Sequence, residues 1–142
     1  MCFVCGRDNP IGFHVHFFED AKGCVRANVA PRAEHQGYPG VMHGGLVTAL
    51  LDEIIGRTAI AQNMWCMTAK LNVRFRQPVP IGEPIQLKGE ITRKTNRVVE
   101  GRGEVRLEDG TLLAEASGTM MKIPESRLTQ YQSALQWWRV DE

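Results

Sequence analysis

Residues 35–56, HQGYPGVMHGGLVTALLDEIIG, form the stretch that decides the fold. Its first half is rich in glycine, which permits positive-φ conformations, and contains a proline, which fixes its own backbone torsion, so it predicts a loop. From Leu46 the residues are strong helix formers, and a helix is predicted to begin at or next to Gly44 and Gly45. The stretch therefore predicts a loop that leads directly into a helix.

The predicted helix is apolar around almost its whole circumference. Its apolar residues are Leu46, Val47, Ala49, Leu50, Leu51, Ile54, Ile55, Ala59, Ile60 and Ala61. A helix of this kind is normally buried, so its few small or polar positions are informative. Gly45, Thr48, Asp52 and Gly56 share one face and predict a narrow stripe against which another element packs.

Two carboxylates in this helix have different explanations. Glu53 stands four residues before Arg57, and we expect an exposed ion pair between them. Asp52 falls on the stripe of small residues, where a carboxylate costs free energy unless it is paired, hydrogen-bonded or used in chemistry. Asp52 is therefore either a satisfied aspartate of the core or an interface, or a catalytic group.

The start of the predicted helix is suited to holding a negatively charged oxygen. The amides of the first turn have no carbonyl partner within the helix and lie at the positive end of its dipole. Gly44 and Gly45 have no side chains, so an oxygen can approach their backbone closely.

The composition predicts one globular domain over residues 1–142. The chain is 43% hydrophobic and 23% charged, which is ordinary for a soluble protein. Its net charge of +1 gives no reason to expect nucleic acid as a partner. No apolar run reaches the ~18 residues needed to cross a membrane, and the first residues lack the pattern of a signal peptide. We expect a cytoplasmic protein without a membrane partner.

The four cysteines are expected to be reduced thiols, because no secretion signal accompanies them. Cys2 and Cys5 have the spacing of metal ligands, and His14 and His16 would complete a zinc site. The favoured interpretation is that Cys2 and Cys5 are small buried residues of an N-terminal turn, with no bound metal.

Segments that alternate apolar and polar residues predict an antiparallel sheet. They cover residues 11–18, 24–29, 67–77, 85–92, 99–107 and 112–120. In the third segment, Ala69, Leu71, Val73 and Phe75 are expected to face inward, and Thr68 outward. The inner faces of the later segments hold many glycines and alanines, which leave room for a helix on a concave face.

We therefore predict an α+β fold in which a curved antiparallel sheet wraps around one long central helix. Leu128, Tyr131, Leu135 and Trp138 recur at helical spacing and predict an amphipathic C-terminal helix. This helix, together with Trp137, is expected to cover the sheet or a neighbouring subunit. One central helix does not cover all the predicted apolar surface, so a second copy of the chain is the expected partner.

These features together resemble the hotdog-fold acyl-CoA thioesterases of the PaaI-like group. The resemblance rests on His43-Gly44-Gly45 at the start of a buried helix, on Asp52 nine residues after the histidine, and on four long strands. It covers roughly residues 11–123, and the N-terminal Cys-x-x-Cys-Gly motif resembles a subgroup of the family. It implies a hotdog fold, hydrolysis of acyl-CoA thioesters without a cofactor, and a homodimer or homotetramer.

The resemblance also implies roles for particular residues. Asp52 would act as general base or nucleophile, and the amide of Gly45, or of Gly44, would polarise the thioester carbonyl. These two groups would come from different subunits, which places the active site at their interface. Thr68 would help to hold the nucleophilic water, and His43 would either donate a hydrogen bond to the thioester or hold the loop.

Some relatives have an asparagine six residues before the histidine, where this chain has Gly37. His35 or Gln36 would take over its part in binding the substrate. In an alternative to its covering role, the C-terminal helix would be a lid over the acyl pocket. Two other functions fit the same fold: a non-catalytic acyl-CoA binding or sensor module, and a dehydratase or hydratase that uses His43 with an acid.

Overall fold

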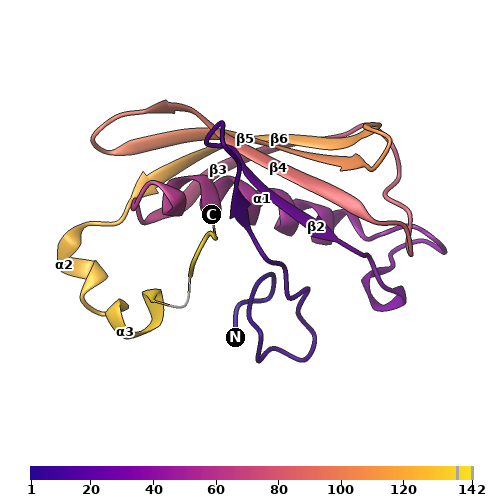
Figure 1. The fold of residues 1–142 in the computed structure, drawn as a ribbon, viewed down its shortest axis with the longest axis horizontal. Coiled ribbons are helices and arrows are strands. Elements are labelled where there is room, and N and C mark those ends of the chain that lie inside the picture. The colour runs from indigo at the N-terminus through magenta and orange to yellow at the C-terminus, as the bar shows by residue number, and fades with distance from the viewer. Residues whose placement is uncertain (137, 142) are drawn as a thin grey trace.

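The computed structural model describes residues 1–136 and 138–141. It contains a six-stranded antiparallel sheet that curves around one long helix (Figure 1). The main elements are β1 (Phe18–Glu19), β2 (Val25–Val29), α1 (Gly44–Ala61), β3 (Cys66–Phe75), β4 (Ile85–Lys94), β5 (Val98–Leu107) and β6 (Leu112–Lys122). The strands lie in the order β1-β2-β4-β5-β6-β3, so β3 forms one edge of the sheet. The predicted α+β architecture is confirmed.

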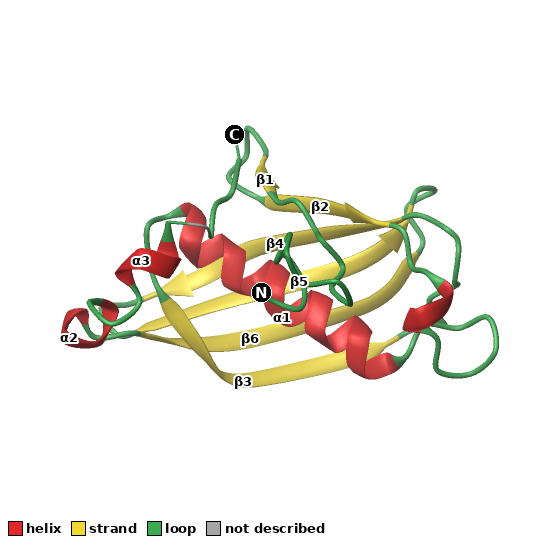
Figure 2. Ribbon diagram, turned by 90° about the horizontal axis from the view of Figure 1, so that it is seen from below, coloured by secondary structure: helices red, strands yellow, loops and turns green. Residues whose placement is uncertain are grey.

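Helix α1 begins at the predicted glycine pair and crosses the concave face of the sheet (Figure 2). Leu50, Leu51, Ile54 and Ile55 are at most 1% exposed. A Cβ atom at Gly89 of β4 would lie 2.7 Å from the backbone oxygen of Ile54, so the glycine there lets the helix approach the sheet. The small inner residues therefore make room for α1, as the sequence indicates.

The first predicted strand, residues 11–18, is wrong except at its end. His14 has a positive φ of 56°, which interrupts an extended strand. The amide of Val15 donates to the carbonyl of Val4 at 2.9 Å, so this part of the segment pairs with the N-terminal segment, and only Phe18 pairs with β2. Val15 is apolar because it packs in the interior, where it is buried. Ile11 is 69% exposed, so the alternation does not mark one buried face of a strand.

The C-terminal segment forms two single-turn helices, α2 (Glu125–Leu128) and α3 (Gln132–Leu135), where one amphipathic helix was expected. Between them the amides of Gln130 and Tyr131 donate to carbonyls three residues earlier, which interrupts the α-helical pattern. Trp137 lies outside the described residues. No helix among the described residues is both long and apolar enough to span a membrane.

Strand β3 leaves one side of the sheet incomplete. It pairs with β6, and in the described part of the chain nothing pairs with its other edge. Met67 and Phe75, near the two ends of β3, are 56% and 54% exposed. An unpaired edge strand of this length with exposed apolar side chains is a surface to which another chain can add.

Candidate active site

The loop before α1 is held by its own polar groups. His43 is the N-cap of α1, and its Nδ1 accepts a hydrogen bond from the amide of Gly45 at 2.9 Å. The amide of His43 donates to the carbonyl of His35 at 2.8 Å, and the Oε1 atom of Gln36 accepts from the amide of Gly40 at 2.7 Å. These bonds fix where the first turn of α1 points.

The two predicted carbonyl-binding amides are in different states. The amide of Gly45 is occupied by the His43 ring, whose Nδ1 must be unprotonated to accept it. The amide of Gly44 donates to no group among the described residues, and Gly44 is exposed. Gly44 is therefore the member of the pair that offers a free donor at the positive end of the helix.

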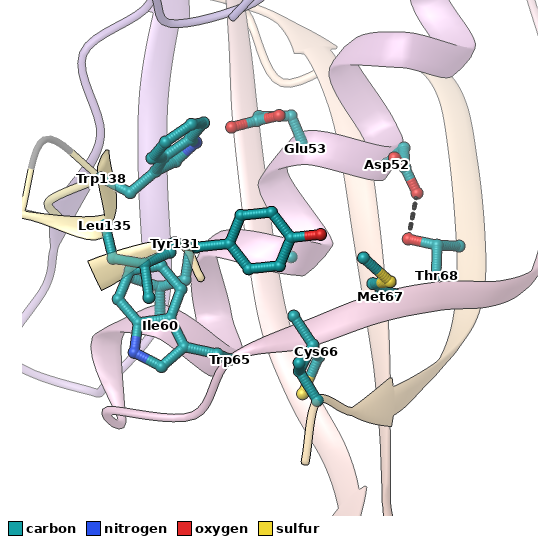
Figure 3. A pocket seen from close by; sticks show the side chains of 12 residues that line it. Asp52, Glu53, Ile60, Trp65, Cys66, Met67, Thr68, Tyr131, Leu135 and Trp138 are labelled. Atoms are coloured by element: carbon teal, nitrogen blue, oxygen red, sulfur yellow. Dashed lines mark hydrogen bonds between the residues drawn. The ribbon is translucent and has the colours of Figure 1, made fainter. Parts of the chain in front are cut away.

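Asp52 and Thr68 are brought together by a β-bulge. Thr68 Oγ1 donates to Asp52 Oδ1 at 2.7 Å, as the dashed line in Figure 3 shows. The pairing of β3 with β6 shifts by one residue between Thr68 and Lys70, so the alternation of faces changes there. Strict alternation placed Thr68 on the outer face, and the extra residue, Ala69, is what makes that prediction wrong.

A cleft of about 300 Å³ opens beside Asp52. Its apolar lining comes from α1, β3 and the C-terminal segment (Figure 3) and includes Ile60, Trp65, Met67, Tyr131, Leu135 and Trp138. The C-terminal segment thus forms a wall of this cleft. This arrangement is closer to the alternative of a lid over a pocket than to that of a cover over the sheet. Trp65 is a contributor that sequence periodicity did not identify, because it lies in the connection before β3.

The free amide and the carboxylate are too far apart to act on one carbonyl group from the same chain. Asp52 is the eighth residue after Gly44 in the helix, which places it about 12 Å further along the axis. Reacting atoms and the groups that stabilise them lie about 3 Å apart. A site that uses both kinds of group must therefore take them from two helices.

His35 and Gln36 lie in the loop and not in the cleft beside Asp52. The His35 side chain is 3% exposed and packs against the Phe13 ring, with 4.2 Å between the ring centroids. Its Nδ1 accepts from the amide of Arg32 at 2.9 Å, and burial lowers the pKa of its imidazole. Gln36 is exposed, but its carbonyl oxygen is used within the loop. In this chain both residues shape the path of the loop.

The ion pair between Glu53 and Arg57, which was expected to be exposed, is largely buried, because the Arg57 side chain is buried and that of Glu53 is 20% exposed. Arg57 is 2% exposed and donates to Glu53 Oε1 through two nitrogens, at 2.9 and 2.7 Å. The helical spacing of the pair resembles a surface pattern, but the N-terminal segment covers this face, and Cys2 and Cys5 lie against it. Burial raises the pKa of the Glu53 carboxyl group.

The alternative zinc site of two cysteines and two histidines does not form. His14 Nε2 lies 2.5 Å from the carbonyl oxygen of Asn9, and His16 is exposed. In the described part of the chain, the cysteine sulfurs gather instead with a Glu53 carboxylate oxygen. The alternation that placed the histidines together belongs to the strand that the structure lacks.

The curved sheet around α1, with a free amide at the start of the helix and a carboxylate about two turns further on, is the architecture of a hotdog protein. Residues 39–114 match the family model of the Thioesterase superfamily. The chain belongs to this superfamily, and the predicted hotdog fold is confirmed.

Three similar proteins illustrate the relationship. Mouse acyl-coenzyme A thioesterase THEM4 is 29% identical over 96 residues, which cover 66% of this chain and 41% of the mouse protein. A putative esterase of Saccharolobus solfataricus is 30% identical over 100 residues, or 69% of this chain and 71% of the relative. A crystal structure of a thioesterase superfamily protein matches with a TM-score of 0.80 at 30% identity, over 83% of this chain and 61% of that one. The chain spans about half the length of the THEM4 and THEM5 proteins that it matches.

Proposed function

We propose that this chain hydrolyses acyl-CoA thioesters to a free acid and CoA, in active sites that two copies of the chain build together. The observation that carries the proposal is the pairing of Asp52 with Thr68 beside an apolar cleft. Family membership supports the reaction class, because the chain matches the Thioesterase superfamily.

Asp52 supplies the group that attacks or activates water. Thr68 holds one carboxylate oxygen at 2.7 Å, and the other accepts no hydrogen bond from the described residues. The free oxygen is available either to take a proton from water or to attack the thioester carbon directly. The hydroxyl of Thr68 fixes the orientation of the carboxylate for either step.

The free amide of Gly44 on the second copy supplies the donor for the thioester oxygen. Hydrolysis places negative charge on that oxygen, and a helix N-terminus stabilises it. Because Gly44 and Asp52 of one chain are about 12 Å apart, the donor comes from the neighbouring α1. His43 supports this arrangement by engaging the adjacent amide, which keeps the first turn in place.

A homodimer, or a homotetramer made of such dimers, provides the second helix. The inner face of β3 is incompletely covered, since Leu71 and Val73 are half-buried and Phe75 is exposed. Phe75 also lies against Gly44, where a Cβ atom would be 3.5 Å from its ring. A partner that covers β3 is thereby brought next to the start of α1.

The acyl group occupies the cleft beside Asp52. Its walls are largely apolar, and two tryptophans and a tyrosine contribute to them. An acyl chain or an aryl group gains free energy by leaving water for such a surface. The charged CoA portion then extends toward solvent from the thioester.

The proposal is tested by measuring CoA release from short, long and aromatic acyl-CoAs. We expect Asp52→Asn to lower kcat on the best substrate by about 10²- to 10⁴-fold while the protein stays folded. Asp109→Asn, in the exposed turn between β5 and β6, is the matched control and should retain the wild-type rate. Tight acyl-CoA binding without turnover would instead favour the non-catalytic binding module.

A single-turnover reaction in ¹⁸O-labelled water separates the two roles of Asp52. If the carboxylate activates water, the acid from the first turnover carries the label. If the carboxylate attacks the carbonyl and water then opens the mixed anhydride at the Asp52 carbonyl, an unlabelled oxygen of Asp52 enters the first acid and the label enters the protein. Opening at the acyl carbonyl labels the acid instead, so label in the protein is the result that identifies nucleophilic attack. Mass spectrometry of the acid and of the peptide that contains Asp52 reads out both cases.

A further inference from the structure

The Cys2-x-x-Cys5 turn takes no part in the proposed hydrolysis, yet the fold builds it closely. The amide of Gly6 donates to the carbonyl of Cys2 at 3.0 Å, which closes the turn. A Cβ atom at Gly6 would lie 2.5 Å from the backbone nitrogen and oxygen of Cys2, so glycine is required there. The two sulfurs and a carboxylate oxygen of Glu53 all lie within 4.8 Å of one another.

The buried Arg57 faces this pair of thiols. Its Nη2 atom lies 2.7 Å from Cys5 Sγ and 2.7 Å from Glu53 Oε1. The guanidinium group also lies over the Phe17 ring, 4.9 Å from its centroid, and Arg57 is 2% exposed. A fixed positive charge here disfavours a metal cation, because it engages two of the three candidate ligands. The same charge stabilises a sulfur anion.

The two thiols are not equivalent. The Cys5 thiol, and the amides of Cys5 and Val4, donate hydrogen bonds to the Cys2 sulfur and lower its pKa to about 5. The hydrogen bond to Cys2, together with burial, raises the pKa of Cys5. Both residues are half-buried, so a small reagent can reach the pair. Of the two sulfurs, that of Cys2 is thus the one more readily ionised, and Cys5 holds a thiol next to it.

We propose that Cys2 and Cys5 form a redox-active dithiol that closes to a disulfide by exchange with a low-molecular-weight disulfide. The Cys2 thiolate attacks one sulfur of the small disulfide, forms a mixed disulfide and releases a small thiolate. Cys5 then attacks the Cys2 sulfur and displaces the second small thiolate. The proton of Cys5 passes to a released thiolate, and solvent protonates the other. In sum, two protein thiols are oxidised and one small disulfide is reduced to two thiols.

The test equilibrates the full chain in glutathione buffers of increasing oxidised fraction, followed by alkylation and peptide mass mapping. We expect the alkylation of Cys2 and of Cys5 to fall together, with one midpoint in the glutathione series. The peptide that contains both cysteines should then be two hydrogens lighter than its dithiol form. Cys66→Ser is the matched control, because it removes a half-buried thiol outside the pair, and it should leave that midpoint unchanged.

Single substitutions assign the order of the two steps. Cys5→Ser should accumulate a glutathione adduct on Cys2, since the residue that resolves it is gone. Cys2→Ser should accumulate none on Cys5. Both variants keep a hydroxyl in the turn, and a thermal unfolding midpoint close to that of the wild type shows that the fold is retained.

The alkylation rate at pH 6 provides a second readout. A thiol of pKa about 5 is almost fully ionised at this pH, whereas an ordinary thiol is ionised to well under about 1%. After allowing for the lower intrinsic nucleophilicity of a low-pKa thiolate, Cys2 should react with iodoacetamide about tenfold faster than a cysteine in an unstructured peptide.

Three results would overturn the proposal. In the first, both cysteines remain free to react in fully oxidised glutathione. In the second, Cys2 reacts at pH 6 no faster than the peptide thiol. In the third, the purified chain holds about one equivalent of zinc that both serine variants lose, which would make the turn a metal site.

Discussion

The hydrogen bond from Thr68 to Asp52 is the contact on which the proposed chemistry most depends. Thr68→Val removes the donor and keeps the shape of the side chain. A hydrogen bond to a charged group contributes about 1.5–3 kcal/mol, so kcat should fall about tenfold or more. Thr68→Ser restores a hydroxyl and should recover most of the rate. Steady-state kinetics on the best acyl-CoA decide the matter, and wild-type turnover by the valine variant would refute this role of Thr68.

Arg57 and Glu53 contribute to stability as a pair. Arg57→Met should lower the free energy of unfolding by about 3–5 kcal/mol, because it leaves the Glu53 carboxylate largely buried without a partner. The double variant Glu53→Gln, Arg57→Met removes that unpaired charge and should be more stable than the single variant. Urea unfolding of the three proteins measures both differences. Equal losses in the single and double variants would show that the pairing is not what matters.

At the scale of elements, the distance between α1 and the sheet is set by glycine. Gly89→Ala would place a methyl group 2.7 Å from the backbone oxygen of Ile54, which cannot move without shifting the helix. We expect a loss of about 1–3 kcal/mol in the free energy of unfolding. Gly56→Ala is the control within α1, where a Cβ atom meets nothing within 4 Å, and it should stabilise the chain by up to about 1 kcal/mol. Thermal and urea unfolding compare them, and an unchanged Gly89→Ala variant would show that α1 has room to move.

The elements that the sequence predicts best are those whose local pattern agrees with their surroundings. The start of α1 follows from the glycine pair and the helix formers after it, and β3 to β6 follow from long alternation. The same rule fails at Thr68, because a bulge is one extra residue and leaves no mark in the apolar pattern. It fails again at residues 11–18, where alternating side chains pack against an irregular N-terminal segment.

The candidate site was predictable in part. The sequence selects Asp52, Thr68 and the glycine pair as candidates, but their contacts required coordinates. Which glycine amide is free depends on the rotamer of His43. An ion pair four residues apart on a helix has the same spacing in the sequence whether it is exposed or covered by another segment, as Arg57 and Glu53 are. The wall of the cleft joins residues from distant parts of the chain, which periodicity cannot place together.

At the scale of the whole molecule, the proposed site requires the free amide and the carboxylate to meet across two copies of the chain. Gly44→Pro isolates the amide, since it removes only that N–H group. His43 has φ −61° and ψ 130°, the conformation preferred before proline, and proline is well tolerated as the first residue of a helix. This variant should therefore fold, and losing one such donor should lower kcat about 10²- to 10³-fold.

The most direct measurement mixes Gly44→Pro chains with Asp52→Asn chains by co-refolding and follows acyl-CoA hydrolysis. Each variant alone is expected to be nearly inactive. If two copies share each site, the mixed dimer contains one intact site, and random pairing should restore about a quarter of the wild-type activity. If the mixture stays as inactive as its components while mixed dimers are present, the amide and the carboxylate do not act across the interface, and the composite site is contradicted.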